Sequence, residues 1–162
     1  YTLPENSAKV LISKEQLTPQ NSSTPLDVSY FIFSNDEQKV LIFTNTKRVW
    51  RLNTKGDYWV LDIAKGSLTQ LGTSLPEASL MFAKFSPDGE AVAYVSDNNI
   101  YVEDINSGAI EQITSDGSDS IVNGTFDWVY EEEFHAKEVH CKERIQPTGY
   151  FILQNDRERV WA

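Results

Sequence analysis

The densest group of chemistry-bearing side chains in this sequence is a run of three glutamates beside two aromatic residues, Asp-Trp-Val-Tyr-Glu-Glu-Glu at positions 127–133. Carboxylates held close together repel one another, and one of them takes up a proton unless a cation neutralises the group. A primary α-ammonium, with a pKa near ~8, is such a cation at neutral pH. At ~4 Å and an effective dielectric constant of ~20, one such contact contributes about 4 kcal/mol before desolvation. Paired carboxylates here would select a free amino terminus over an acylated one, although a run of glutamates is more often a solvated face.

A second candidate group is basic and lies in the segment 46–60, which we interpret as a loop. It holds four basic side chains in a chain of formal net charge −10: Lys47, Arg48, Arg51 and Lys55. An arginine can point its fork of donors at a carbonyl or carboxylate of a ligand. The pair Trp50-Arg51, an aromatic residue beside a guanidinium, is the strongest candidate for that role. The alternative is a solvated basic loop without a ligand.

Other catalytic patterns are mostly absent, since there is no Gly-x-Ser-x-Gly elbow, phosphate loop or Gly-x-Gly-x-x-Gly. His135, His140 and Cys141 lie near the glutamates, but the step between the two histidines does not fit one helix face and no cysteine pair accompanies them. The thiol of Cys141 has His140 beside it and no evident third group to orient that base. We therefore predict no metal, no cofactor and no catalytic nucleophile within the chain.

The composition is that of an ordinary soluble globular chain, with 162 residues, 40% hydrophobic and 23% charged. Aromatic residues make up 12% against a single methionine, which favours β-rich packing. The negative charge excludes nucleic acid as a partner, because it repels phosphate. No apolar run approaches the ~18–20 residues that span a bilayer, and the single cysteine, Cys141, cannot form an internal disulfide.

The elements that must position these groups are predicted to be two copies of a four-stranded unit. Turn sequences rich in proline, glycine, asparagine and aspartate separate the strands of the clearer copy, residues 82–114. The predicted strands are Leu80–Phe85, Ala91–Val95, Ile100–Ile105 and Ala109–Ile113. In the third of them, alternation places Tyr101 and Glu103 on one side and Ile100 and Val102 on the other.

The earlier copy spans residues 30–71. Its Phe-Ser-Asn-Asp at 33–36 precedes Phe-Ser-Pro-Asp by 52 residues, whereas its Leu-Asp-Ile-Ala-Lys-Gly at 61–66 precedes the related Glu-Asp-Ile-Asn-Ser-Gly by 42. The earlier copy therefore holds ten extra residues in its middle. A four-stranded repeat of about 40–50 residues is typical of a propeller blade, and a plain meander or β-sandwich is the alternative.

We therefore expect an all-β fold, a partial β-propeller of about two four-stranded blades plus an incomplete third. Three segments are expected: an irregular lead-in with the first propeller strands at 1–29, two blades with the glutamate segment at 30–134, and a divergent tail at 135–162. The tail fits the turn of a third blade only loosely. Two blades and a piece cannot close a ring, because each blade buries its faces against neighbours, so we expect a fragment of an eight-bladed propeller.

Residues 127–133, preceded by Asn123-Gly124, resemble the glutamate motif of the dipeptidyl peptidase IV family of serine exopeptidases, which are of the prolyl-oligopeptidase type. Trp50-Arg51, followed by Tyr-Trp-Val-Leu-Asp at 58–62, is similar to the arginine-bearing segment of the same propeller. The resemblance covers roughly residues 8–134. It implies an N-terminal eight-bladed propeller, a C-terminal α/β-hydrolase domain with a Ser-Asp-His triad, and release of X-Pro or X-Ala dipeptides from free N-termini.

The resemblance also implies residue roles. Glu132 and Glu133 would bind the α-ammonium of the substrate, and Arg51 would contact the carbonyl between its first two residues. Glu131 has no ligand role by this correspondence and is expected to be structural. Three residues are expected to support the segment: Asp127, Trp128 and Tyr130.

The implied partners are peptides with a free N-terminus and the C-terminal hydrolase domain of the same chain, with a homodimer left open. That domain is absent from these 162 residues, so the isolated chain is expected to be inactive. The expected location is periplasmic, secreted or cell-surface, with the targeting segment outside this chain. Two other functions stay open: a non-catalytic propeller that binds a basic partner, and a structural β-rich surface protein without a ligand.

Overall fold

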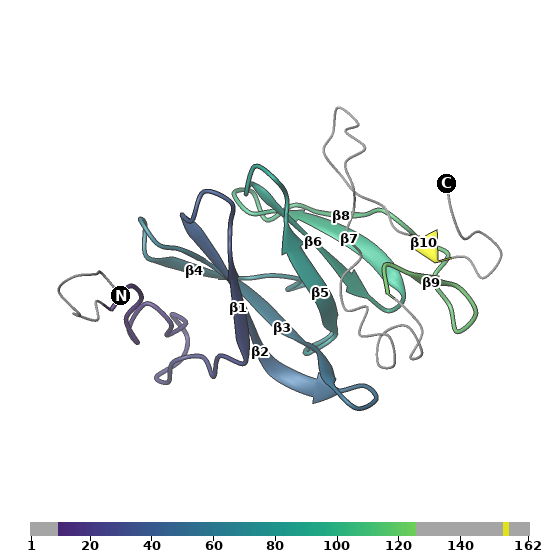
Figure 1. Ribbon diagram of the computed structural model, residues 1–162, viewed down its shortest axis with the longest axis horizontal. Helices are drawn as coiled ribbons and strands as arrows, with labels where there is room; N and C mark the ends of the chain where they lie inside the picture. Colours follow the sequence, from purple (N-terminus) through teal and green to yellow (C-terminus); the bar gives the residue numbers. More distant parts are fainter. Residues whose placement is uncertain (1–9, 126–153, 156–162) are drawn as a thin grey trace, which may run out of the picture.

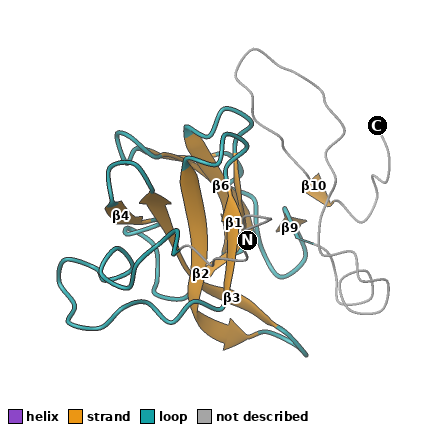
Figure 2. Cartoon of the chain, turned by 60° about the vertical axis from the view of Figure 1, so that its left-hand side comes forward, coloured by secondary structure: helices purple, strands orange, loops and turns teal. Residues whose placement is uncertain are grey.

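The computed structural model describes residues 10–125 together with residues 154 and 155. In this part of the chain the regular structure consists of strands without helices (Figure 2), so no helix in it is long and apolar enough to cross a membrane. The strands are β1 Tyr30–Phe33, β2 Lys39–Arg48, β3 Asn53–Asp62, β4 Ser67–Gln70, β5 Leu80–Phe85, β6 Ala91–Ser96, β7 Asn99–Asp104, β8 Ile110–Gln112, β9 Val122–Asn123 and β10 Gln154–Asn155.

Two four-stranded antiparallel meanders form the body of the described chain and lie side by side (Figure 1). The first consists of β1 to β4 and the second of β5 to β8, in the positions that the sequence repeat predicts. In the second meander β5 matches its predicted bounds, while the other three strands differ from theirs by one residue at one or both ends. A short pairing of β3 with β5 joins the two meanders into one sheet.

The turn that opens the first meander is held by a serine and an aspartate. Ser34 Oγ donates to Asp36 Oδ1 at 2.6 Å and accepts from the Lys39 backbone N–H at 2.9 Å. The backbone N–H of Gln38 donates to the same Asp36 oxygen at 3.1 Å. Short polar side chains bind nearby backbone in this way and so favour turns over strands.

The same arrangement opens the second meander 52 residues later. Ser86 Oγ donates to Asp88 Oδ1 and accepts from the Ala91 backbone N–H at 2.9 Å, and the Glu90 N–H donates to Asp88 Oδ1 at 3.0 Å. The two closing hairpins match as well. Asp62 Oδ1 accepts from the Lys65 N–H, and the aspartate 42 residues further on, Asp104, accepts from the Ser107 N–H. The sequence repeat is therefore a structural repeat.

The ten extra residues of the first copy lengthen the β2–β3 hairpin. Strands β2 and β3 have ten residues each, against six each in β6 and β7. The turn between β2 and β3, residues 49–52, is two residues longer than the turn at 97 and 98. Our interpretation of residues 46–60 as a loop was therefore wrong for most of the segment. Backbone pairing of β2 with β3 extends through it, with register shifts between Thr44 and Arg48.

The main hydrophobic core lies between the two meanders. Side chains of both meanders contribute to it, so that one face of each is covered by the other. Its buried members are Leu41, Phe43, Tyr58, Val60, Leu71, Leu80, Ala83, Val92 and Tyr94. The other face of the first meander, with Val40, Ile42 and Leu61, is covered by Ile12, Leu17 and Leu26 from the segment before β1.

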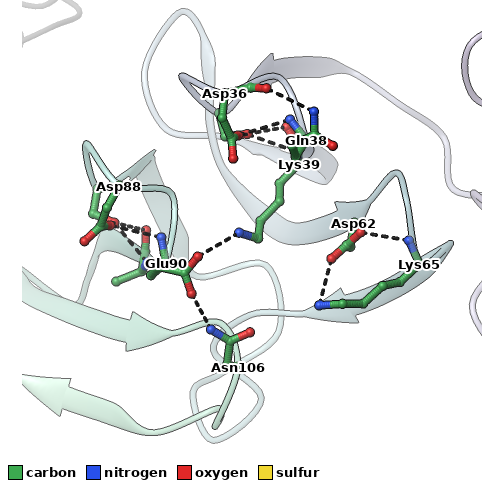
Figure 3. A network of polar contacts seen from close by, with 11 residues as sticks. Asp36, Gln38, Lys39, Asp62, Lys65, Asp88, Glu90 and Asn106 are labelled. Carbon is green, nitrogen blue, oxygen red and sulfur yellow. Dashed lines mark hydrogen bonds and ion pairs between the residues drawn. The ribbon is translucent and has the colours of Figure 1, made fainter.

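Polar contacts join the two meanders beside this core. Lys39 Nζ lies 3.2 Å from Glu90 Oε1, and Asn106 donates to the other oxygen of Glu90 (Figure 3). The two opening turns also touch, because Asn35 Nδ2 donates to the Pro87 carbonyl oxygen at 3.0 Å. The repeated turns therefore shape each meander and also fix its position against the next.

Candidate functional site

Arg51 lies in the turn between β2 and β3, at the tip of the long hairpin, where it is exposed. The turn is closed by a hydrogen bond from the Val49 N–H to the Leu52 carbonyl oxygen at 3.1 Å. Arg48 Nε donates to the Trp50 carbonyl oxygen at 2.8 Å, which ties the preceding strand end to the same turn. The guanidinium of Arg51 therefore sits on a defined hairpin tip.

The other predicted site residues lie outside the described residues. These are Asp127, Trp128, Tyr130, Glu132 and Glu133, as well as Glu131 and the His135, His140 and Cys141 group. The continuous described stretch, residues 10–125, ends just before them. Two described segments adjoin this site: the hairpin that carries Arg51, and β9 with the residues after it, which precede the glutamates in the sequence.

The long hairpin is fixed against the second meander at its middle. Its strand β3 pairs with β5 through Gly56 and Leu80, and a side chain at Gly56 would have no room, since a Cβ there would lie 2.5 Å from Phe43 Cε2. The buried carboxylate of Asp57 accepts from the Ala78 N–H and from Asn45 Nδ2, each at 2.7 Å. Beyond this anchor point the hairpin continues to the turn that holds Arg51.

The hairpin tip reaches the far face of the second meander. That face carries a separate apolar group, Met81, Val95 and Ile100, which we call the far-face cluster. Val49, the first residue of the Arg51 turn, packs against it. The extra length of the first hairpin therefore carries Arg51 from the first meander to the outer side of the second.

The approach to the glutamates meets the same cluster. Gly124 has a φ of 75°, and a Cβ on it would lie 2.6 Å from Val95 Cγ2 and 2.9 Å from Ile100 Cγ1. Only a residue without a side chain adopts this conformation so close to its neighbours. Just before it, Asn123 is completely buried, and its backbone N–H donates to the Asn98 carbonyl oxygen at 3.1 Å. The arginine turn and Gly124, which precedes the glutamate segment, thus both contact the far-face cluster.

Two buried hydroxyl groups and one buried carboxylate belong to the core. Burial raises the pKa of Tyr58 to about 12, and burial, followed by the charge of Glu103, also raises the pKa of Tyr94. Glu103 accepts from the Tyr94 hydroxyl at 2.9 Å and from the Gly72 N–H at 2.8 Å, which ties the second meander to the segment after β4. Both tyrosines therefore stay neutral at physiological pH, and these groups hold the fold.

Sequence reasoning missed two features of this region. It placed Glu103 on a strand face but gave no sign that the carboxylate would be buried. It also treated Asn98 and Asn123 only as parts of a turn and of a motif, although both hold the approach to the glutamates. Among residues 10–125, 154 and 155, no three histidine, cysteine, aspartate or glutamate side chains are placed to hold a metal ion.

Comparison with known proteins decides the family. The model of the dipeptidyl peptidase IV N-terminal region matches residues 34–141, which is 108 of the 162 residues. The chain belongs to this family. Its membership confirms the resemblance that the glutamate and arginine segments carry.

Several curated relatives of this dipeptidyl peptidase IV N-terminal region are fungal. The probable dipeptidyl-aminopeptidase B of Chaetomium globosum is 40% identical over 100 residues, which are 62% of this chain and 11% of that protein. The protein of the same name from Tuber melanosporum is 33% identical over 135 residues, 80% of this chain and 15% of that protein. The chain thus spans only a small part of the length of the curated relatives it matches.

A solved structure also matches the chain. The crystal structure of Porphyromonas gingivalis dipeptidyl peptidase 4 superposes with a TM-score of 0.68 and 29% sequence identity, covering 80% of this chain and 18% of that one. The expected all-β fold of propeller-type blades is confirmed, and the two meanders are two such blades.

Proposed function

We propose that this chain is the part of a serine-type dipeptidyl peptidase that holds the free N-terminus of the peptide substrate. In this proposal Glu132 and Glu133 accept hydrogen bonds from the α-ammonium, and Arg51 donates to the carbonyl oxygen between the first two substrate residues. Supporting contacts come from Asp127, Trp128 and Tyr130. The bond is cut by the serine of an α/β-hydrolase domain in the same protein, so the 162 residues alone would release no dipeptide.

The observation that supports this best is the convergence of two distant segments on the far-face cluster. Val49 and Gly124 are 75 positions apart in the sequence, yet both contact this cluster. The turn that carries Arg51 and the residue that leads to the glutamate segment therefore lie at the same apolar cluster. A guanidinium and paired carboxylates have opposite charges, and together they match the carbonyl oxygen and the ammonium at the two ends of one amino-terminal residue.

Such an anchor would determine which bond is cut. If the ammonium is clamped at a fixed distance from a serine, only the second peptide bond reaches that serine. Positioning of this kind converts binding energy into selection of the cleavage site. Acylation of the substrate removes its positive charge, so the same clamp would reject blocked peptides.

The test uses the full-length protein and a Gly-Pro reporter with a free amine. Replacing Glu132 or Glu133 with glutamine removes one charge-assisted hydrogen-bond acceptor, which is worth about 1.5–3 kcal/mol. We therefore expect kcat/KM to fall by about tenfold to a hundredfold in each variant. Arg51→Met should also lower kcat/KM.

Glu131→Gln is the matched control, because it removes the same charge from the neighbouring position and should leave kcat/KM close to that of the wild type. Equal values for all three glutamate variants would remove the anchoring role. A complete parent sequence without a Gly-x-Ser-x-Gly elbow would instead favour the non-catalytic binding protein.

A further inference from the structure

A polar network lies where the chain leaves the second blade toward the glutamates. It consists of four side chains, Asn98, Asn99, Asp116 and Asn123, which we call the asparagine clip. Asn98 belongs to the tight turn between β6 and β7, and Asn99 begins β7. Asp116 lies in the segment after β8, and Asn123 is the last residue of β9.

Asn123 is the central member of the clip. Its Nδ2 donates to the Asn98 carbonyl oxygen at 3.1 Å and to Asp116 Oδ1 at 3.0 Å. Its side chain is completely buried, and within the described residues its Oδ1 has no hydrogen-bond partner. Burying a polar atom without a partner is unfavourable, and such cases are rare in folded proteins. Burial of the Asn123 side chain therefore has a cost in free energy.

The other members hold the intervening segment against the same turn. Asn99 Oδ1 accepts from the Gly117 N–H at 2.9 Å and from the Thr114 hydroxyl at 3.2 Å. Asn98 Nδ2 donates to the Ser118 carbonyl oxygen at 3.1 Å. A Cβ on Gly117 would collide with the Asn98 carbonyl oxygen, so only glycine fits there. Residues 114–123 are thus closed into a loop whose end is fixed to the turn at 97 and 98.

The loop fixes the position and direction of the chain at Gly124. That glycine is wedged between Val95 and Ile100 in a left-handed conformation, directly after the most buried member of the clip. Glu132 and Glu133 follow eight and nine positions later. Val49 of the Arg51 turn packs against the same far-face cluster, so the clip fixes, relative to that turn, the point from which the segment with the glutamates starts.

We propose that Asn123, held by Asn98 and Asp116, is a positioning residue for the ammonium-binding glutamates. It acts through the glutamates and does not itself touch the substrate. This inference rests on the proposed function, since it assigns Asn123 a role in the same site.

The test replaces Asn123 with aspartate in the full-length protein. This change keeps the shape of the side chain but places a carboxylate oxygen against the Asn98 carbonyl and Asp116 Oδ1, where the native amide donates. We expect KM for a free-amine Gly-Pro reporter to rise on the order of tenfold, the size of one lost buried hydrogen bond. The preference for the free amine over the N-acetylated reporter should fall by a similar factor. Labelling of the catalytic serine by a small fluorophosphonate should keep its wild-type rate.

Two further variants sharpen the test. Asn21→Asp makes the same chemical change at an exposed asparagine and should leave all three measurements unchanged. Asp116→Ala removes one acceptor of Asn123 at an exposed position, and should lower the amine preference in the same direction by a smaller factor. If Asn123→Asp does not fold, Asp116→Ala alone tests whether the clip determines the amine preference.

The outcomes separate this inference from the proposed function. If Glu132→Gln and Glu133→Gln lose the amine preference while the clip variants keep it, Asn123 is only structural and the inference is overturned. If the clip variants lose activity equally toward both reporters and toward the fluorophosphonate, Asn123 is likewise only structural and the inference is overturned. If the glutamate variants also keep the preference, the proposed function fails, and the role of Asn123 fails with it.

Discussion

At the scale of single residues, the two opening turns show how a short polar sequence determines a local structure. Ser34 with Asp36, and Ser86 with Asp88, satisfy the same backbone groups 52 positions apart. The hydrogen bond from Ser34 lowers the pKa of Asp36, and the backbone N–H of Gln38 adds to this effect. Ser86 and then the Glu90 N–H lower the pKa of Asp88 in the same way.

These shifts predict how stability depends on pH. A carboxyl group whose pKa is lowered by folding stabilises the folded state above its unfolded pKa of about 3.9, and this contribution is lost as the pH falls through the folded value. The double variant Asp36→Asn with Asp88→Asn should therefore be less stable than the wild type at neutral pH. The difference should shrink as the pH falls below about 4.

Urea unfolding of the chain at several pH values would measure this difference. Asp119→Asn, at an exposed aspartate in the loop after β8, is the control and should follow the wild type throughout. A double variant whose deficit stays constant down to pH ~2 would show that the carboxylates are not responsible.

The two turns and Glu103 mark what could be predicted from the sequence at this scale. The turns were predicted because their serines and aspartates bind backbone only a few positions away, so the pattern is local. The burial of Glu103 was not, because its partners are the Gly72 N–H and the Tyr94 hydroxyl, 31 and 9 positions away. The role of Asn123 was not predicted for the same reason, since its hydrogen bond to Asn98 spans 25 positions.

At the scale of elements, the long β2–β3 hairpin connects the fold to the site. The offset between the two repeats predicted ten additional residues, but the basic composition of 46–60 suggested a loop. Pairing with the opposite strand and with β5 made most of it strand. Long-range pairing of this kind is not visible in local composition. For the glutamates, the motif predicts a role, and that role stays a prediction.

Asp57 provides the test of how this hairpin is held. Two donors, the Ala78 N–H and Asn45 Nδ2, converge on its buried carboxylate. Asp57→Asn would turn one acceptor into a donor that faces another donor, so we expect a loss of about 1–3 kcal/mol in the free energy of unfolding. Thermal or urea unfolding would measure it. Glu111→Gln, on the exposed side of β8, should change stability little, and equal stability of both variants would mean that Asp57 does not anchor the hairpin.

At the scale of the whole molecule, the two blades cover only part of each other's surface. The main core closes one face of each blade, and the segment before β1 covers part of the opposite face of the first. On that face, Phe31 and Phe33 are exposed and pack edge to face, with ring centroids 5.8 Å apart. Their strand, β1, is an edge of the sheet within the described residues.

An edge strand with exposed aromatic side chains favours pairing with another chain. We therefore predict that the isolated 162-residue chain self-associates at micromolar concentration, and that Phe31→Ser with Phe33→Ser shifts it toward the monomer. Sedimentation velocity would measure the change. Val10→Ser is the matched control, because Val10 is 77% exposed but lies before β1 and outside the sheet. If this control dissociates the chain as strongly as the double variant, association depends on general surface hydrophobicity and not on the β1 edge. If neither variant changes the sedimentation coefficient, the exposed aromatic edge does not mediate association.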